Sequence, residues 1–115
     1  AGKNRVIPNS KKILPFITEL YKKNHESEFL IEINEKYKRA KYDTLRRTWF
    51  AKAMQLTHLN LTPHDGRHTC ATLLNNAGVN ATTIKFILGH SSRDVTEKVY
   101  THKSIEQLIE AIDLI

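Results

Sequence analysis

Apolar residues recur at helical spacing in two stretches of the first half of the chain. Ser10 is a suitable N-cap for a helix that reaches about Lys23, with Pro15 in its first turn, where a missing N–H costs least. The apolar face of this helix would carry Ile13, Leu14, Ile17 and Leu20. A second helix is expected over residues 44–56, with Asp43 as its cap. Its apolar stripe, which should face the core, comprises Leu45, Trp49, Ala53 and Leu56.

The next helix has clear start and stop signals. Thr62 as N-cap, Pro63 as the first helical residue and Asp65 at the third position are typical of a capping box, and Gly78 ends the helix. The inner stripe of this helix is predicted to comprise Gly66, Cys70, Leu73 and Ala77.

The helices that follow also begin at polar caps. Asn80 would cap a helix that Gly89 ends, with Val79 and Ile84 placed as a hydrophobic staple. Ser91 would start a short helix that contains Val95 and Val99 and ends at Tyr100, with Asp94 at its third position. A last helix would start at Ser104, with an apolar side of Ile105, Leu108, Ile109, Ile112 and Leu114.

Two short segments favour extended structure instead. The sequence RVIP follows a turn and predicts a short strand leading away from it, and EFLIEIN predicts a strand or an extended piece. The run EKYKRAKY is expected to be a basic loop. The predicted fold is therefore mainly α, with a short strand pair or β-hairpin remnant packed on the helices.

The charge balance indicates an anionic partner. The 115 residues carry a formal net charge of +6 with a pI of about 9.6, which favours nucleic acid or an acidic membrane surface. Arg46, Arg47 and Lys52 lie off the apolar stripe of their helix, on a face that is either solvated or follows a phosphate backbone. Cys70 is the only cysteine, so no internal disulfide is possible. No apolar run suits a membrane span or a signal peptide.

The stretch HDGRHTCAT raises the question of chemistry. His64 and His68 stand four residues apart on the predicted helix, as in H-E-x-x-H zinc sites. Arg67 would place a fixed cation beside such an ion, and zinc needs a third protein ligand. The other histidines provide no second pair at ligand spacing. We therefore expect no bound metal, which leaves a proton-transfer site or a merely polar helix face.

Three motifs in fixed order change that balance. HDGRHTCATLLNNAG, then ILGHSS, then VTEKVYTH follow one another between His64 and His102. This order resembles the tyrosine recombinase (phage-integrase) family, whose catalytic domain carries an H-x-x-R-H-T-x-A-T helix, an L-G-H-S turn and then a nucleophilic tyrosine. Upstream, NRVIP and YDTLRRTWFAKAM are similar to the strand and the helix that precede the first motif.

The resemblance implies a role for each matching residue. Arg67 would clamp the scissile phosphate, which suits a guanidinium because it offers two parallel donors and stays protonated. His64 would assist proton transfer and hold a phosphate oxygen, and His90 would lie beside the phosphate. Tyr100 would be the nucleophile and form a 3′-phosphotyrosine. His68 lies off this face and is expected to be structural.

The chain also departs from the family pattern. Position 66 is usually a core-facing leucine in the family, and Gly66 would leave room there that a neighbouring residue must fill. No stretch resembles the family's early arginine motif, and Lys3 lies one turn position late for its hairpin lysine. Residues 1–115 are thus interpreted as the C-terminal part of a catalytic domain, without its first part or the core-binding domain. Alone, this chain should fold but not cleave DNA.

The expected function is that of a site-specific DNA recombinase, with integration or excision of a mobile element as its setting. Its partners would be double-stranded DNA and other recombinase protomers in a synaptic assembly, with no cofactor and no membrane. The expected protein is bacterial or phage-encoded and is located in the cytoplasm. It would be associated with the nucleoid when it is bound to DNA. Two alternatives are a non-catalytic DNA-binding module and a zinc hydrolase. A covalent adduct at Tyr100 excludes the first, and a metal assay tests the second.

Overall fold

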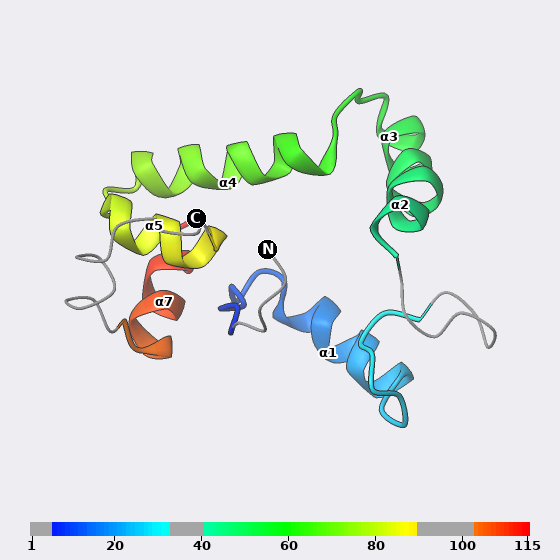
Figure 1. Ribbon diagram of the computed structural model, residues 1–115, viewed down its shortest axis with the longest axis horizontal. Coiled ribbons are helices and arrows are strands. Elements are labelled where there is room, and N and C mark those ends of the chain that lie inside the picture. Colours follow the sequence, from blue (N-terminus) through cyan, green and yellow to red (C-terminus); the bar gives the residue numbers. More distant parts are fainter. Residues whose placement is uncertain (1–5, 33–40, 90–102) are drawn as a thin grey trace. The chain divides into compact units, whose positions relative to one another are not determined.

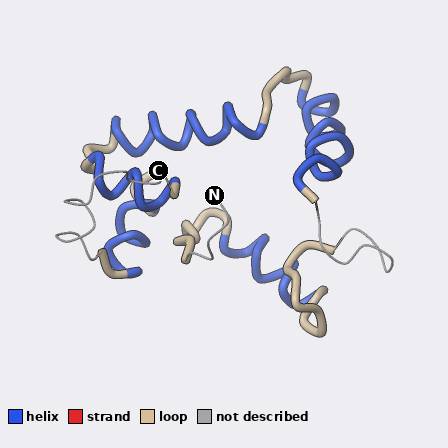
Figure 2. The backbone as a smooth tube through the Cα atoms, viewed as in Figure 1, coloured by secondary structure: helices blue, strands red, loops and turns tan. Residues whose placement is uncertain are grey.

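The computed structural model describes residues 6–32, 41–89 and 103–115, and throughout these ranges the regular structure is helical (Figures 1 and 2). This confirms the prediction of a mainly α chain. None of the helices is long and apolar enough to cross a membrane in the described part. The helices are α1 (Leu14–Lys23), α2 (Tyr42–Leu45), the π-helical turn η1 (Arg46–Phe50), α3 (Ala51–Thr57), α4 (Pro63–Asn76), α5 (Ala81–Leu88) and α7 (Ile105–Ile112).

The chain divides into two compact units. One unit combines Ala1–Lys12 with Arg67–Ile115, and the other is Ile13–Gly66. The boundary falls within α4, so the first turn of this helix is assigned to one unit and the remainder to the other.

The core of the first unit lies where α4, α5 and α7 meet. Leu74 of α4 is completely buried, and around it lie the buried side chains of Ile87, Leu108, Ala111 and Ile112. Partly buried apolar residues complete this cluster: Cys70, Val79, Ile84 and Ile115. Figure 1 shows α5 running back along the C-terminal part of α4. Burial of these side chains is the main stabilising contribution that the described residues offer.

The buried face of α4 differs from the predicted one. Leu74 is buried, whereas Leu73 is 47% exposed and Gly66 and Ala77 are also exposed, so only Cys70 of the predicted stripe packs inward. Neighbouring leucines lie about 100° apart around a helix, and periodicity alone does not decide which of them meets α5. The room that Gly66 was expected to leave is open space, because no heavy atom lies within 4 Å of a Cβ built there.

The capping residues predicted for α4, α5 and α7 are confirmed, whereas Ser91 and the short helix predicted to start there lie outside the described residues. Asp65 accepts hydrogen bonds from the backbone N–H and the hydroxyl of Thr62, and its own N–H donates to the Thr62 hydroxyl at 3.3 Å. Gly78 follows α4 with a φ of 80°. Asn80 accepts the Thr83 N–H at 2.9 Å, and Ser104 forms a full capping box with Gln107. These local contacts fix where α4, α5 and α7 begin.

The starts of two earlier helices were predicted wrongly. Helix α1 begins at Leu14 with Ile13 as N-cap, because residues 11–13 form a turn and Ser10 is buried, with its hydroxyl accepting the Lys12 N–H. The N-cap of α2 is Lys41, and Asp43 lies inside the first turn, where it pairs with Arg46 at 3.9 Å.

The unit Ile13–Gly66 buries few of its apolar side chains. Trp49 is 50% exposed and Leu56 is 72% exposed, and Ala53 is exposed as well, so this stripe does not face a core as predicted. Leu45 is half-buried. A helical pattern defines an apolar face, but it does not supply the surface that covers it, and no described residue of this unit covers Trp49 or Leu56 fully.

Neither of the two predicted strands is formed by the residues of those segments that the structure describes. Residues 6–8 and 28–32 form no ladder. In the second segment, nearby side chains bind the backbone groups: the Ser27 hydroxyl accepts the Phe29 N–H at 3.0 Å, and the Asn24 amide donates to the Leu30 carbonyl at 2.7 Å. Such bonds compete with strand pairing. Residues 5 and 33–34 of the expected strands, and most of the basic loop, lie outside the described residues.

The segment before α1 is tied to the end of α7. The Lys11 N–H donates to the Asp113 carboxylate at 2.8 Å, the Lys11 ammonium lies 3.3 Å from the same group, and the Lys12 ammonium donates to the Ile115 carbonyl. The Lys11 backbone N–H is the largest cause that holds the pKa of Asp113 below its usual value. Because the fold favours the ionised carboxylate, this contact weakens as the pH falls through the lowered pKa.

The two adjacent leucines of α4 provide a direct test of the core. Leu74→Ala should lower the free energy of unfolding by about 2–5 kcal/mol, because it leaves a cavity among α4, α5 and α7. Leu73→Ala, the same chemical change one residue earlier, should cost about 1 kcal/mol or less. Urea unfolding of both variants, followed by circular dichroism, measures the difference. Equal losses of stability in the two variants would contradict the burial of Leu74 and the exposure of Leu73.

Candidate functional site

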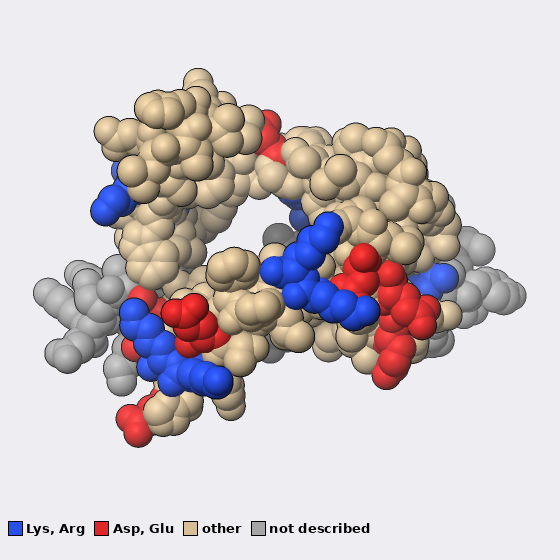
Figure 3. Space-filling model, turned by 180° about the vertical axis from the view of Figure 1, so that it is seen from behind, with Lys and Arg blue, Asp and Glu red and all other residues tan. Residues whose placement is uncertain are grey.

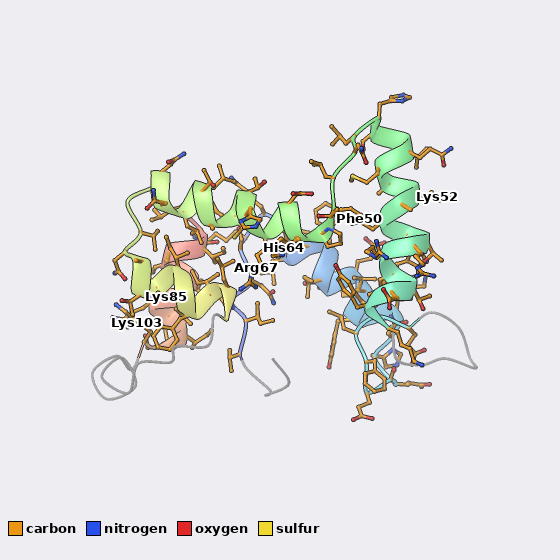
Figure 4. All side chains as sticks on the ribbon, turned by 45° about the horizontal axis from the view of Figure 1, so that its top comes forward. Phe50, Lys52, His64, Arg67, Lys85 and Lys103 are labelled. Atoms are coloured by element: carbon orange, nitrogen blue, oxygen red, sulfur yellow. The ribbon has the colours of Figure 1, made fainter. Side chains whose placement is uncertain are left out.

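The first two turns of α4 carry the two described residues with the clearest chemistry. His64 and Arg67 lie three positions apart on this helix and therefore on neighbouring parts of its surface (Figure 4). The His64 side chain is exposed, whereas Arg67 is half-buried. The Thr62–Asp65 capping box fixes the beginning of this helix, so Asp65 has a structural role at the start of the motif.

Arg67 reaches across to the end of α5. Its Nη1 donates a hydrogen bond to the Leu88 carbonyl oxygen at 2.6 Å. Gly89, the residue after Leu88, adopts a left-handed conformation with a φ of 69° and ends the helix. The guanidinium is thus tied to the helix end that immediately precedes His90 in the sequence.

Cys70 lies on the same side of α4, one turn after Arg67. Its thiol is partly buried against the core, and this burial raises its pKa above the usual value. The positive charge of Arg67 acts in the opposite direction and lowers the pKa. Cys70 therefore packs against the core, and the pKa of its thiol depends on the nearby charge of Arg67.

Three predicted site residues lie outside the described residues: Lys3, His90 and Tyr100. Their roles stay predictions. His68 is described and exposed on α4. In the described part of the chain, no group of three or more His, Cys, Asp or Glu side chains could hold a metal ion.

Of the four predicted DNA-binding residues, Lys3 lies outside the described residues and the other three lie on the helical segment that precedes α4. Arg46 and Arg47 belong to η1 and Lys52 to α3, and all three side chains are exposed (Figure 4 labels Lys52). The ion pair with Asp43 partly offsets the charge of Arg46. On the face drawn in Figure 3, Lys and Arg side chains stand beside Asp and Glu side chains rather than forming one uniform basic surface. Charge alone therefore does not single out a nucleic-acid interface.

One member of this site escaped prediction from sequence. The Leu88 carbonyl is a backbone group, so no side-chain motif points to it. The available signals were the L-G-H-S motif, which contains Leu88, and the predicted helix stop at Gly89, and neither indicates that a carbonyl accepts a hydrogen bond from Arg67.

Comparisons with known proteins agree with the motif order. The model of the phage integrase family matches residues 1–107. The tyrosine recombinase XerA of Pyrococcus horikoshii is 32% identical over 114 residues, and that of Thermococcus kodakarensis is 33% identical over 113 residues. These alignments cover 97% and 96% of this chain but only 40% and 39% of the relatives. The tyrosine recombinase XerC of Corynebacterium glutamicum is 41% identical over 63 residues, which are 55% of this chain and 20% of that protein. No solved structure matches the chain.

The electrostatic effect of Arg67 on Cys70 can be tested by thiol chemistry. Alkylation by iodoacetamide proceeds through the thiolate, so its rate follows the pKa of Cys70. Arg67→Gln removes the charge that lowers this pKa, and the midpoint of the rate–pH profile should therefore move to higher pH. Lys103→Gln makes the same change in net charge at another position and should leave the midpoint in place. An identical shift in both variants would show that net charge, not the neighbouring guanidinium, controls the thiol.

Proposed function

The chain belongs to the phage integrase family, and we propose that it forms the C-terminal part of the catalytic domain of a site-specific tyrosine recombinase. The chain spans about 40% of the length of the curated relatives it matches, and they are named as tyrosine recombinases. The proposed substrate is double-stranded DNA. The first part of the catalytic domain and the core-binding domain would be supplied by sequence outside these 115 residues.

The proposed reaction is phosphoryl transfer to a tyrosine. The Tyr100 oxygen attacks the scissile phosphorus as its proton leaves, the bond from phosphorus to the 5′-oxygen breaks, and that oxygen departs as a 5′-hydroxyl after protonation. The product is a 3′-phosphotyrosine, and attack by a 5′-hydroxyl reverses the step. The ordinary pKa of tyrosine is about 10, so positive neighbours are needed to favour the phenolate.

Arg67 and the two histidines would stabilise the charge that develops on the phosphate. A guanidinium can donate two parallel hydrogen bonds to phosphate oxygens and retains its charge at all relevant pH values. His64 would hold a phosphate oxygen and assist proton transfer, with His90 beside it. In a site of this kind, the loss of a single preorganised donor typically costs about 10²–10³ in rate. This chemistry requires fixed donors and an in-line nucleophile, with no metal among the proposed groups.

The observation that carries the proposal is the placement of Arg67. The guanidinium is half-buried and bonded to the last carbonyl of α5, so it is held on the folded core instead of extending freely into solvent. His64 lies on the same helix, and His90 follows α5 directly in the sequence. A helix face that served only for solubility would not require an arginine fixed in this way.

The wider setting is also part of the proposal. Cutting and rejoining two duplexes requires several active sites, so other recombinase protomers would join this chain in a synaptic assembly. Integration or excision of a mobile element is the proposed outcome, in the cytoplasm of a bacterial cell. A DNA-binding module without catalysis would share the basic helices but would form no covalent bond to DNA.

Covalent capture tests the nucleophile. The full-length protein is incubated with sheared, nicked genomic DNA from its own source, and protein–DNA adducts are recovered under denaturing conditions and sequenced. The wild type should yield adducts linked through Tyr100, and Tyr100→Phe should yield none, because the attacking oxygen has been removed. Tyr42→Phe loses a hydroxyl at an exposed position of α2 and should react normally. Adducts in the Tyr100→Phe variant would identify another nucleophile, and their absence from the wild type would reject the proposed reaction.

Salt dependence tests the proposed DNA-binding residues. Each phosphate contact that is lost should reduce the slope of log affinity against log salt by about 0.9. Arg47→Gln combined with Lys52→Gln should therefore make the slope shallower by about 2. Lys22→Gln with Lys23→Gln removes the same charge from the end of α1 and should change the slope little. The measurement is fluorescence anisotropy on a duplex at several salt concentrations, and equal effects of both pairs would reject a specific role for Arg47 and Lys52.

A further inference from the structure

The contact between Arg67 and the end of α5 is a candidate for control of the site, and it involves a backbone carbonyl inside the L-G-H-S motif to which the motif itself assigns no role. We propose that the C-terminal turn of α5, formed by Leu88 and the left-handed Gly89, positions the Arg67 guanidinium for the scissile phosphate. The inference rests on the proposed function, because it concerns the same reaction. Leu88 acts through its carbonyl and touches no substrate, so it is a positioning residue rather than a catalytic one.

The geometry leaves the arginine able to do both tasks. A guanidinium carries five N–H donors in a planar fork. The bond to the Leu88 carbonyl uses Nη1. The edge formed by Nε and Nη2 presents two parallel donors, faces away from Nη1 and is not engaged by this bond. One bond to the protein can therefore fix the plane of the guanidinium while the bidentate edge remains directed at a phosphate.

The end of a helix suits this purpose. The last carbonyls of an α-helix have no partner further along the same helix, and their partial negative charge favours a nearby cation. In α5 the Gly89 N–H turns back to the carbonyls of Lys85 and Phe86. The Leu88 carbonyl is one of those at the helix end, and Arg67 donates to it.

Gly89 shares a peptide plane with that carbonyl. Its φ of 69° lies in the left-handed region, which glycine adopts readily, asparagine tolerates and a β-branched residue avoids. A residue that leaves this region changes the angle between the Leu88–Gly89 peptide plane, which carries the Leu88 oxygen, and the backbone that follows it. Where the peptide plane takes up this change, the identity of residue 89 alters a hydrogen bond made by residue 67.

The test compares three variants of the full-length protein on a nicked duplex of the sequence recovered by covalent capture. Gly89→Val should lower the single-turnover rate of adduct formation at saturating protein by about 10- to 100-fold, since a displacement of about 1 Å can cost 10²-fold. Its affinity for the duplex should change little. Gly89→Asn, which retains the left-handed conformation, should react at close to the wild-type rate.

Gly78→Val is the matched control. Gly78 also ends a helix with a positive φ, of 80°, and a Cβ at this position would meet no heavy atom within 4 Å. Valine there introduces the same kind of backbone strain away from Arg67. Its rate of adduct formation should stay within a few-fold of the wild type.

Cys70 provides a readout that needs no DNA. Displacement of Arg67 removes a charge that lowers the pKa of Cys70, so Gly89→Val should move the alkylation midpoint to higher pH, toward that of Arg67→Gln. Simple loosening of the core would expose the thiol and move the midpoint in the opposite direction. The sign of the change therefore separates positioning of the arginine from general damage.

Each outcome decides the inference. A slow Gly89→Val variant with a raised Cys70 midpoint, restored by Gly89→Asn and not reproduced by Gly78→Val, supports it. A slow variant whose midpoint is unchanged or lowered overturns it, because the loss then arises from His90 or from unfolding. Wild-type rates in Gly89→Val also overturn it. Failure of the wild type to form any adduct would instead reject the proposed function. The pH profile of Cys70 alkylation would still show whether Gly89→Val displaces Arg67 from the Leu88 carbonyl.

Discussion

The burial of Leu74 is the packing contact on which the unit containing α4, α5 and α7 depends. Leu74 is completely buried in a cluster that contains side chains of the other two helices. Arg67 precedes it by seven residues, which is close to two full turns, so both side chains leave α4 on the same face about 10 Å apart. Helix α5 has eight residues and is about 12 Å long, and it runs back from the Gly78 turn. The last carbonyl of α5 therefore lies beside Arg67. The packing of α5 against α4 thus also determines where the Arg67 guanidinium is bound.

Much of the helical architecture could be predicted because its signals are local. The Thr62–Asp65 box and the caps at Asn80 and Ser104 act within a few residues, and the sequence alone identifies them. The choice between Leu73 and Leu74 could not be predicted, because it depends on where α5 and α7 pack. The strand predictions for residues 6–8 and 28–32 failed for a related reason. A strand needs a partner, whereas the backbone around Phe29 is satisfied by nearby side chains.

In the candidate site, too, local motifs could be predicted from the sequence, whereas a contact between two helices could not. The motif HDGRH predicted Arg67 and His64, and the structure places both in the first turns of α4. It adds the bond to the Leu88 carbonyl, which sequence patterns could not reveal because every residue has a carbonyl. The positions of His90 and Tyr100 lie outside the described residues, so their roles rest on motif order and on the family. Arg46, with Asp43 as its partner, illustrates why a count of basic residues overstates the charge available to a ligand.

The contact between Lys11 and Asp113 has a consequence for how the chain folds. The two residues are 102 positions apart, and closing a loop of that length costs about 4 kcal/mol of chain entropy. During synthesis, Lys11 leaves the ribosome long before its partner exists. The segment around Lys11 and Lys12 must therefore wait until α7 has formed, and it docks as a late step. Refolding of the unit would thus be slower than its short helices suggest, because contacts distant in sequence slow folding.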